Sequence, residues 1–92
     1  MTAGLRVCNV VFSPASTSDR RAGLLGYLRF QVCGGLLIDG VTLRRTQAGE
    51  LRLAYPRRGG ELYVVRPMDE ETRRDLERQV FDVLGLDGGG AR

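Results

Sequence analysis

The arginines are the residues of this sequence with the clearest chemical potential. All fourteen basic side chains are arginine and none is lysine, a preference for which a bias toward GC-rich codons is the alternative explanation. A guanidinium group offers a planar fork of donors that suits phosphates and carboxylates, and it stacks on aromatic or base planes. Five arginines gather in the middle of the chain and are candidate nucleic-acid contacts: Arg44, Arg45, Arg52, Arg57 and Arg58.

The positions of these arginines indicate one basic surface. A hairpin joined at residues 47–50 puts Arg44 and Arg52 on a shared outward face, with Arg57 and Arg58 in the adjoining turn. Several guanidinium groups together would engage several phosphates, with an affinity that falls steeply as salt is added. A solvated sheet face with scattered charge is the alternative interpretation.

Charge is divided along the chain. Residues 1–58 carry nine arginines and three acids, whereas residues 59–92 carry five arginines and eight acids, within a net charge of +3. A basic sheet beside a near-neutral to acidic helix predicts a directional electrostatic surface.

Three tyrosines are candidates for stacking on exposed bases. Tyr27 alternates with apolar neighbours, which predicts an exposed ring, although cross-strand packing is the alternative for it. Tyr55 shares the phase of Leu51 and Leu53, which favours core packing, and Tyr63 is the third candidate.

The sequence lacks the residues that several kinds of catalysis require. Histidine is absent, which removes the commonest general base, the usual nucleophile pairs and nearly all zinc sites. Cys8 and Cys33 form no C-x-x-C pair, and we expect buried free thiols; a contact between the two on neighbouring strands is the alternative. The glycine clusters match neither a phosphate loop nor a dinucleotide fingerprint. We therefore expect no enzyme activity, no metal and no cofactor; an enzyme that uses Asp39 or a cysteine thiolate is a remote alternative.

The expected elements are those of an α+β fold, an antiparallel sheet of about five strands with one C-terminal amphipathic helix. Alternating or β-branched runs predict strands over 5–13, 24–33, 36–46, 51–55 and 61–66. Residues 14–23 are predicted to form a loop. Gly34-Gly35 predicts a two-residue hairpin turn, and Asp39-Gly40 predicts a β-bulge. The segment 56–60 interrupts the strand pattern.

The helix has clear start and stop signals. Asp69 is a good N-cap, acids follow in the first turn, and Gly85 is a plausible end. Its apolar face is expected to comprise Thr72, Leu76, Val80, Val83 and Leu84. The opposite face is expected to carry ion pairs between Arg73, Arg74 and Arg78 and the acids Glu70, Glu77 and Asp82.

The sequence predicts one domain over residues 1–86 and a flexible tail over 87–92. A chain this short buries only about 60–65% of its unfolded surface, so we expect a homodimer. Because no secretion signal and no stretch of about 20 apolar residues is present, we expect a cytoplasmic protein with no membrane partner.

The order of motifs resembles the SpoVG family, the stage V sporulation and septation-regulator proteins. The family's strand ending in Met-Pro-Ser-basic corresponds to AYPRR at 54–58. Its Gly-Glu-Phe strand corresponds to GEL at 60–62, and its His-Pro entry to the helix corresponds to RPMD at 66–69. Tyr55 replaces the usual Met and Arg57 replaces Ser, so the chain resembles a divergent member.

The resemblance implies a homodimeric regulator that binds DNA, RNA or both, with Arg57 and Arg58 at the family's basic contacts. For Arg44, Arg45 and Arg52 the prediction rests on local charge and geometry alone. The alternative function is a protein-interaction module that uses a sheet edge or the helix face without binding nucleic acid.

Overall fold

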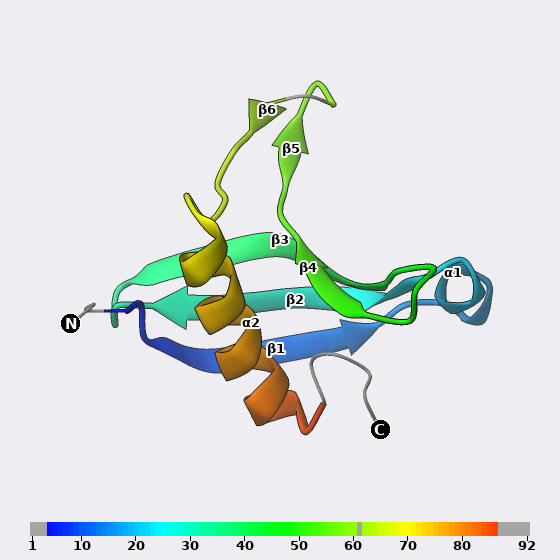
Figure 1. Ribbon diagram of the computed structural model, residues 1–92, viewed down its shortest axis with the longest axis horizontal. Coiled ribbons are helices and arrows are strands. Elements are labelled where there is room, and N and C mark those ends of the chain that lie inside the picture. The colour runs from blue at the N-terminus through cyan, green and yellow to red at the C-terminus, as the bar shows by residue number, and fades with distance from the viewer. Residues whose placement is uncertain (1–3, 61, 87–92) are drawn as a thin grey trace.

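The protein folds as a four-stranded sheet with one long helix and a separate two-stranded ribbon (Figure 1). The computed structural model describes residues 4–60 and 62–86. Its elements are β1 (Val7–Pro14), α1 (Thr17–Arg21), β2 (Leu24–Val32), β3 (Leu36–Arg45), β4 (Leu51–Ala54), β5 (Arg57–Arg58), β6 (Leu62–Tyr63) and α2 (Glu70–Leu84). Strands β1 to β4 pair antiparallel in sequence order, which confirms the expected α+β class.

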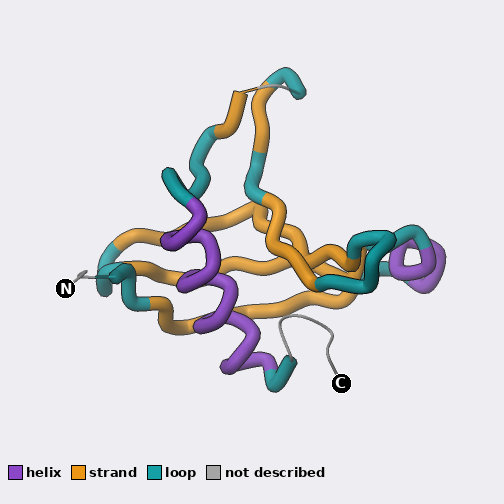
Figure 2. The backbone as a smooth tube through the Cα atoms, in the orientation of Figure 1, coloured by secondary structure: helices purple, strands orange, loops and turns teal. Residues whose placement is uncertain are grey.

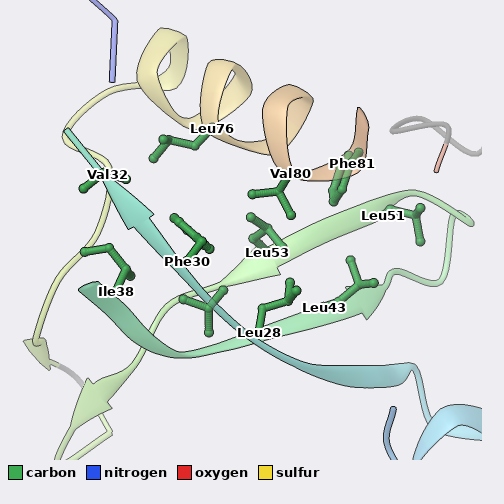
Figure 3. Close-up of a cluster of buried hydrophobic side chains, with 11 residues drawn as sticks. Leu28, Phe30, Val32, Ile38, Leu43, Leu51, Leu53, Leu76, Val80 and Phe81 are labelled. Carbon is green, nitrogen blue, oxygen red and sulfur yellow. The ribbon is translucent and has the colours of Figure 1, made fainter. Parts of the chain in front are cut away.

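The core lies between α2 and one face of the sheet (Figures 1 and 3). Its buried side chains are Leu28, Phe30, Val32, Ile38, Val41, Leu43, Leu51, Leu53, Leu76, Val80 and Phe81. Each fully buried side chain of this kind contributes about 1.5–3 kcal/mol relative to exposure. In β2 the buried residues alternate with exposed Tyr27 and Arg29, so the opposite face of the sheet is open.

A β-bulge interrupts β3 where the sequence predicts it. The β2 residues on either side of Arg29 pair with Ile38 and Val41, so Asp39 and Gly40 together lie opposite one residue. Gly40 has a φ of 76°, which a glycine adopts without strain. The bulge keeps the apolar side chains before and after it on the core face.

The turn between β2 and β3 lies one residue earlier than predicted. Positive φ angles occur at Cys33 and Gly34, at 56° and 74°, instead of at Gly34 and Gly35. The N–H of Gly35 donates to the carbonyl of Val32 at 3.3 Å. The shift follows from the pairing of Val32 with Leu36, which leaves three residues in the loop.

The expectation of buried thiols is wrong for Cys33, which is exposed in this turn, whereas Cys8 is half-buried. Both cysteines are free.

Two short elements replace predicted irregular segments. Helix α1 forms within the predicted loop 14–23 because the Ser16 side chain accepts the N–H of Asp19 at 3.1 Å and caps it. Strand β5 forms within 56–60 and pairs with β6.

The fifth strand predicted over 61–66 does not join the sheet: β6 spans two residues and pairs only with β5. Pro56 lacks an N–H and cannot continue the ladder of β4. Gly59 and Gly60, with φ of 65° and 85°, then turn the chain back on itself. The resulting ribbon projects away from the sheet (Figures 1 and 2).

Helix α2 starts and ends as predicted. The Asp69 side chain accepts the N–H of Thr72 at 2.8 Å, and Gly85 is left-handed with a φ of 73°. The predicted apolar face is wrong at Val83, which is 61% exposed, whereas Phe81 is buried. Glu77, predicted on the outer face, is only 7% exposed. Residues 76, 77, 80, 81 and 84 also fall on one stripe of the helix, but this stripe is rotated toward Glu77 and Phe81 relative to the predicted face.

The tail predicted over 87–92 lies outside the described residues. Within 4–60 and 62–86, no helix has the length and apolar character needed to cross a membrane.

Candidate nucleic-acid interface

Arg44 and Arg52 lie side by side on the open face of the sheet. They are directly opposed partners in the register of β3 and β4, so their side chains point to the same face. Their neighbours Leu43 and Leu53 are buried against α2, which places both arginines on the opposite face. The shared outward face predicted for this pair is therefore confirmed.

Tyr27 lies between this pair and a further arginine. It pairs with Thr42, two residues from Arg44 along β3, while Arg29 is two residues away along β2 in the opposite direction. Residues two apart in a strand are about 7 Å apart on one face. Tyr27 is 47% exposed, as predicted, so its ring is an aromatic platform with guanidinium groups on both sides.

A shallow hollow adjoins this platform. Its volume is about 420 Å³, and its lining is Val11, Ser13, Tyr27, Leu28, Arg29, Asp39 and Gly40. Arg29 was not among the predicted contacts. The alternating pattern of β2 nevertheless places it on the same face as Tyr27, and this pattern could have identified it.

Arg45 lies apart from Arg44 and Arg52. It pairs with Leu51, a core residue, so it projects toward the side of the sheet that carries α2. There it lines a hollow with Leu84 and Leu86. The structure therefore does not bring Arg45 together with the other predicted contacts.

The ribbon holds Arg57 in a defined position. Its Nη1 donates to the carbonyl of Gly60 at 3.0 Å, and its Nη2 donates to the hydroxyl of Tyr63 at 2.9 Å. The guanidinium carbon of Arg57 lies 4.8 Å from the centroid of the Tyr63 ring, and that of Arg66 lies 5.4 Å from it. Both distances are within the range of cation–π attraction.

Arg58 lies on the other face of the ribbon. Arg57 pairs with Tyr63 and Arg58 pairs with Leu62, and successive residues of a strand point to opposite faces. Arg57 and Arg58, which were predicted to act together, are therefore exposed on opposite faces of the ribbon.

The arginines of α2 are engaged locally with acids. Arg73 pairs with Glu77 at 2.7 Å and also with Glu70, and Arg74 pairs with Glu70 at 3.3 Å. Arg78 pairs with Asp75 and Asp82. This confirms the predicted ion-pair surface of the helix. Arg52 is also engaged with an acid, since its Nη2 donates to the carboxylate of Glu50 at 3.2 Å.

These ion pairs and the helix cap shift two acidic pKa values. The hydrogen bond from Arg73 is the main cause that lowers the pKa of Glu70 to about 2. Hydrogen bonds from Thr72 lower the pKa of Asp69. The bond to Glu70 raises the pKa of Arg73, so that its guanidinium stays charged.

Across residues 4–60 and 62–86, no group of three or more His, Cys, Asp or Glu side chains is arranged to hold a metal ion. Comparisons with known proteins yield no relative: no protein-family model matches the chain, and neither a curated protein nor a solved structure does. The resemblance to the SpoVG family stays a prediction from the residues that carry it.

Proposed function

We propose that this chain is a cytoplasmic, non-enzymatic nucleic-acid-binding regulator that acts as a homodimer. A single strand of DNA or RNA would lie across the open face of the sheet. The observation that carries the proposal is the opposed pair Arg44 and Arg52 beside the exposed ring of Tyr27, with Arg29 on the far side of that ring.

The chemistry of this face suits a single strand. An exposed aromatic ring stacks on any base, and one stacked base is worth about 1–3 kcal/mol. The flanking guanidinium groups would contact phosphates, and each phosphate contact adds about 0.7 to the slope of affinity against salt for a single strand.

The ribbon extends the proposed surface. Arg58 is exposed on one of its faces, and Arg57 fixes Tyr63 on the other. Support for a role of these two arginines comes from the resemblance of 54–58 to the basic stretch of the SpoVG family.

Exposed apolar side chains on and after the ribbon support a second copy of the chain as a partner. Leu62, Val64 and Met68 are 72%, 67% and 86% exposed. A two-stranded ribbon is marginally stable without packing against another element.

The alternative function, a protein-interaction module, is less well supported at the sheet edges. Strands β1 and β4 form the two edges. The N–H of Val7 in β1 donates to Gln79, and the N–H of Leu53 in β4 donates to Glu77. These α2 side chains occupy backbone donors that a partner strand would need.

The test is a titration of labelled single-stranded DNA and RNA by fluorescence anisotropy at several salt concentrations. Arg44→Gln/Arg52→Gln is expected to weaken binding and to reduce the slope of log affinity against log salt by about 1.4. The charge-matched control is Arg74→Gln/Arg78→Gln, which removes two arginines from α2 on the other side of the sheet. Its affinity should stay close to that of the wild type.

Two outcomes contradict the proposal. Equal losses in the two double variants would show that net charge, not the open face, governs binding. The absence of binding to either nucleic acid at low salt would reject the function itself.

A further inference from the structure

The β-bulge of β3 places a carboxylate in the hollow of the open face. The residues before and after the bulge are buried in the core, whereas Asp39 and Gly40 are both exposed, opposite Arg29 of β2. The hollow has a volume of about 420 Å³, and its lining includes one carboxylate, one guanidinium group and the ring of Tyr27. β-Bulges often re-aim a side chain next to a functional site. The lining therefore combines an acceptor, a set of donors and an aromatic surface on the face proposed to bind a strand.

The carboxylate of Asp39 has capacity left for a ligand. Its Oδ1 accepts the N–H of Gly40 at 2.8 Å, which orients the group beside the bulge. Within residues 4–60 and 62–86, no arginine forms an ion pair with Asp39. An ionised carboxylate accepts hydrogen bonds and donates none, and its two oxygens offer about four acceptor positions. A ligand that contacts Asp39 must therefore present N–H or O–H donors.

Arg29 supplies the opposite chemistry in the same hollow. Its guanidinium forms no ion pair within the described part of the chain. The fork of donors on an arginine fits two neighbouring acceptors, and the O6 and N7 atoms of guanine are the commonest such pair on a base. Tyr27 lies two residues away on the same face, about 7 Å along the strand, and offers a surface for stacking.

Guanine is the base that matches these three groups together. It presents adjacent N1–H and N2–H donors on one edge and the acceptors O6 and N7 beside them. Adenine and cytosine offer a carboxylate only one amino group each. Uracil and thymine flank their single ring N–H with two carbonyl oxygens, which a carboxylate repels. Proteins read bases of a single strand in this way, by stacking and by hydrogen bonds to the exposed edges.

We propose that this hollow is a guanine-selective subsite of the strand-binding face. Asp39 accepts from N1–H and N2–H of one guanine, Arg29 donates to its O6 and N7, and the ring of Tyr27 stacks on the base. This inference rests on the proposed function and adds to it a choice among bases.

The first measurement uses the wild-type chain. Labelled oligouridine and oligothymidine strands carry a single central guanine, adenine or inosine, and fluorescence anisotropy gives the affinity of each. The guanine strand is expected to bind about tenfold more tightly than the adenine strand, which is within the discrimination that one bidentate contact to a base provides. Inosine keeps O6 and N7 but lacks the 2-amino group, so its strand should bind more weakly than the guanine strand.

The second measurement uses Asp39→Asn. The amide oxygen of asparagine can still accept the N–H of Gly40, while its nitrogen puts a donor in place of the second carboxylate oxygen. The preference for guanine should therefore be lost. Affinity for the plain strand should not fall, because the variant removes a negative charge near the phosphates.

The charge-matched control is Glu50→Gln. Glu50 forms an ion pair with Arg52 at 3.2 Å and does not line the hollow. This variant removes the same charge as Asp39→Asn and should keep the preference for guanine.

Equal affinity for the guanine and adenine strands overturns the inference and leaves the proposed function standing. A guanine preference that survives Asp39→Asn, or that is lost equally in Glu50→Gln, also overturns it. Equal binding of guanine and inosine overturns it as well, and this comparison holds even if Asp39→Asn lowers the melting temperature. Failure of every strand to bind at low salt rejects the proposed function itself.

Discussion

The carboxylate of Glu77 accepts the backbone N–H of Leu53 at 3.1 Å, which joins α2 to the edge strand β4. The same carboxylate accepts from Arg73 at 2.7 Å. Two residues further along α2, Gln79 accepts the N–H of Val7 in β1, the opposite edge, at 2.9 Å. One helix thus hydrogen-bonds to both edges of the sheet, which fixes its direction across the core and occupies one backbone donor on each edge.

Replacement of Glu77 is expected to destabilise the fold strongly. Glu77→Ala leaves the N–H of Leu53 without its acceptor and removes one of the two carboxylates that pair with Arg73, at a cost of about 2–4 kcal/mol of unfolding free energy. Glu77→Gln should cost less, since its amide oxygen still accepts from Leu53. Urea denaturation measures both. Glu71→Ala, on the exposed side of the same helix, is the control and should change stability by less than about 0.5 kcal/mol; similar losses at the two positions would contradict the role of Glu77.

The Glu70–Arg73 pair predicts a pH dependence of stability. The pKa of Glu70 is lowered from an ordinary 4.5 to about 2, mainly by the hydrogen bond from Arg73. Because the folded state holds this proton less tightly than the unfolded chain, the contribution is complete above about pH 4.5 and is lost as the pH falls through about 2. Chemical denaturation at pH 2 to 6 is expected to show a shallower acid loss in Glu70→Gln than in the wild type. The variant keeps Asp69, so some acid dependence remains; identical pH profiles would show that the pair contributes nothing.

The main sheet and the helix were predictable from sequence because their signals are periodic. The alternation of Leu28 and Phe30 with Tyr27 gives the phase of β2, and the phase change across Asp39-Gly40 gives the bulge. The boundaries of α2 follow from local cap chemistry, which does not depend on distant residues.

The ribbon and the burial of Glu77 were not predictable in the same way. A two-residue strand such as β5 is too short to show an alternating pattern of apolar and polar residues. Pro56 and the two glycines after Arg58 therefore indicate only a break in the strand pattern. Glu77 is buried because a free N–H of β4 faces it, and that relation depends on how the helix crosses the sheet.

The candidate site was predictable only in part. Arg44 and Arg45 are adjacent, as are Arg57 and Arg58, and a strand period of two already separates each pair onto opposite faces. Because these arginines are close together in the sequence, they look like one cluster. The strand register, however, places the members of each adjacent pair on opposite faces. The pairing of Arg44 with Arg52 followed from the hairpin because both strands keep their register through the turn.

Gly26 is expected to tolerate no side chain. It lies in β2, where an added Cβ would come within 2.6 Å of the carbonyl oxygen of Ser13 and would overlap the ring of Phe12. Because backbone of the neighbouring strand cannot move aside easily, Gly26→Ala should lower the unfolding free energy by about 1–3 kcal/mol. Gly35→Ala is the matched control, since no atom lies within 4 Å of its added Cβ. Thermal and urea unfolding of the two variants measure the difference, and equal stabilities would contradict the close approach of β1 to β2.

Tyr27 is expected to act through its ring and not through its hydroxyl. The ring is exposed between Arg29 and Arg44, so it can stack on a base without moving core side chains. Tyr27→Ala should therefore weaken binding of single-stranded DNA or RNA by about 1–3 kcal/mol, whereas Tyr27→Phe should retain the affinity of the wild type. Fluorescence anisotropy measures both, and the melting temperature of each variant checks that the fold is intact.

Because stacking is less sensitive to salt than a phosphate contact, Tyr27→Ala should leave the salt slope unchanged, in contrast to the variants of Arg44 and Arg52. An equal loss in Tyr27→Phe would assign the effect to the hydroxyl, and no loss in Tyr27→Ala would remove the platform from the binding surface.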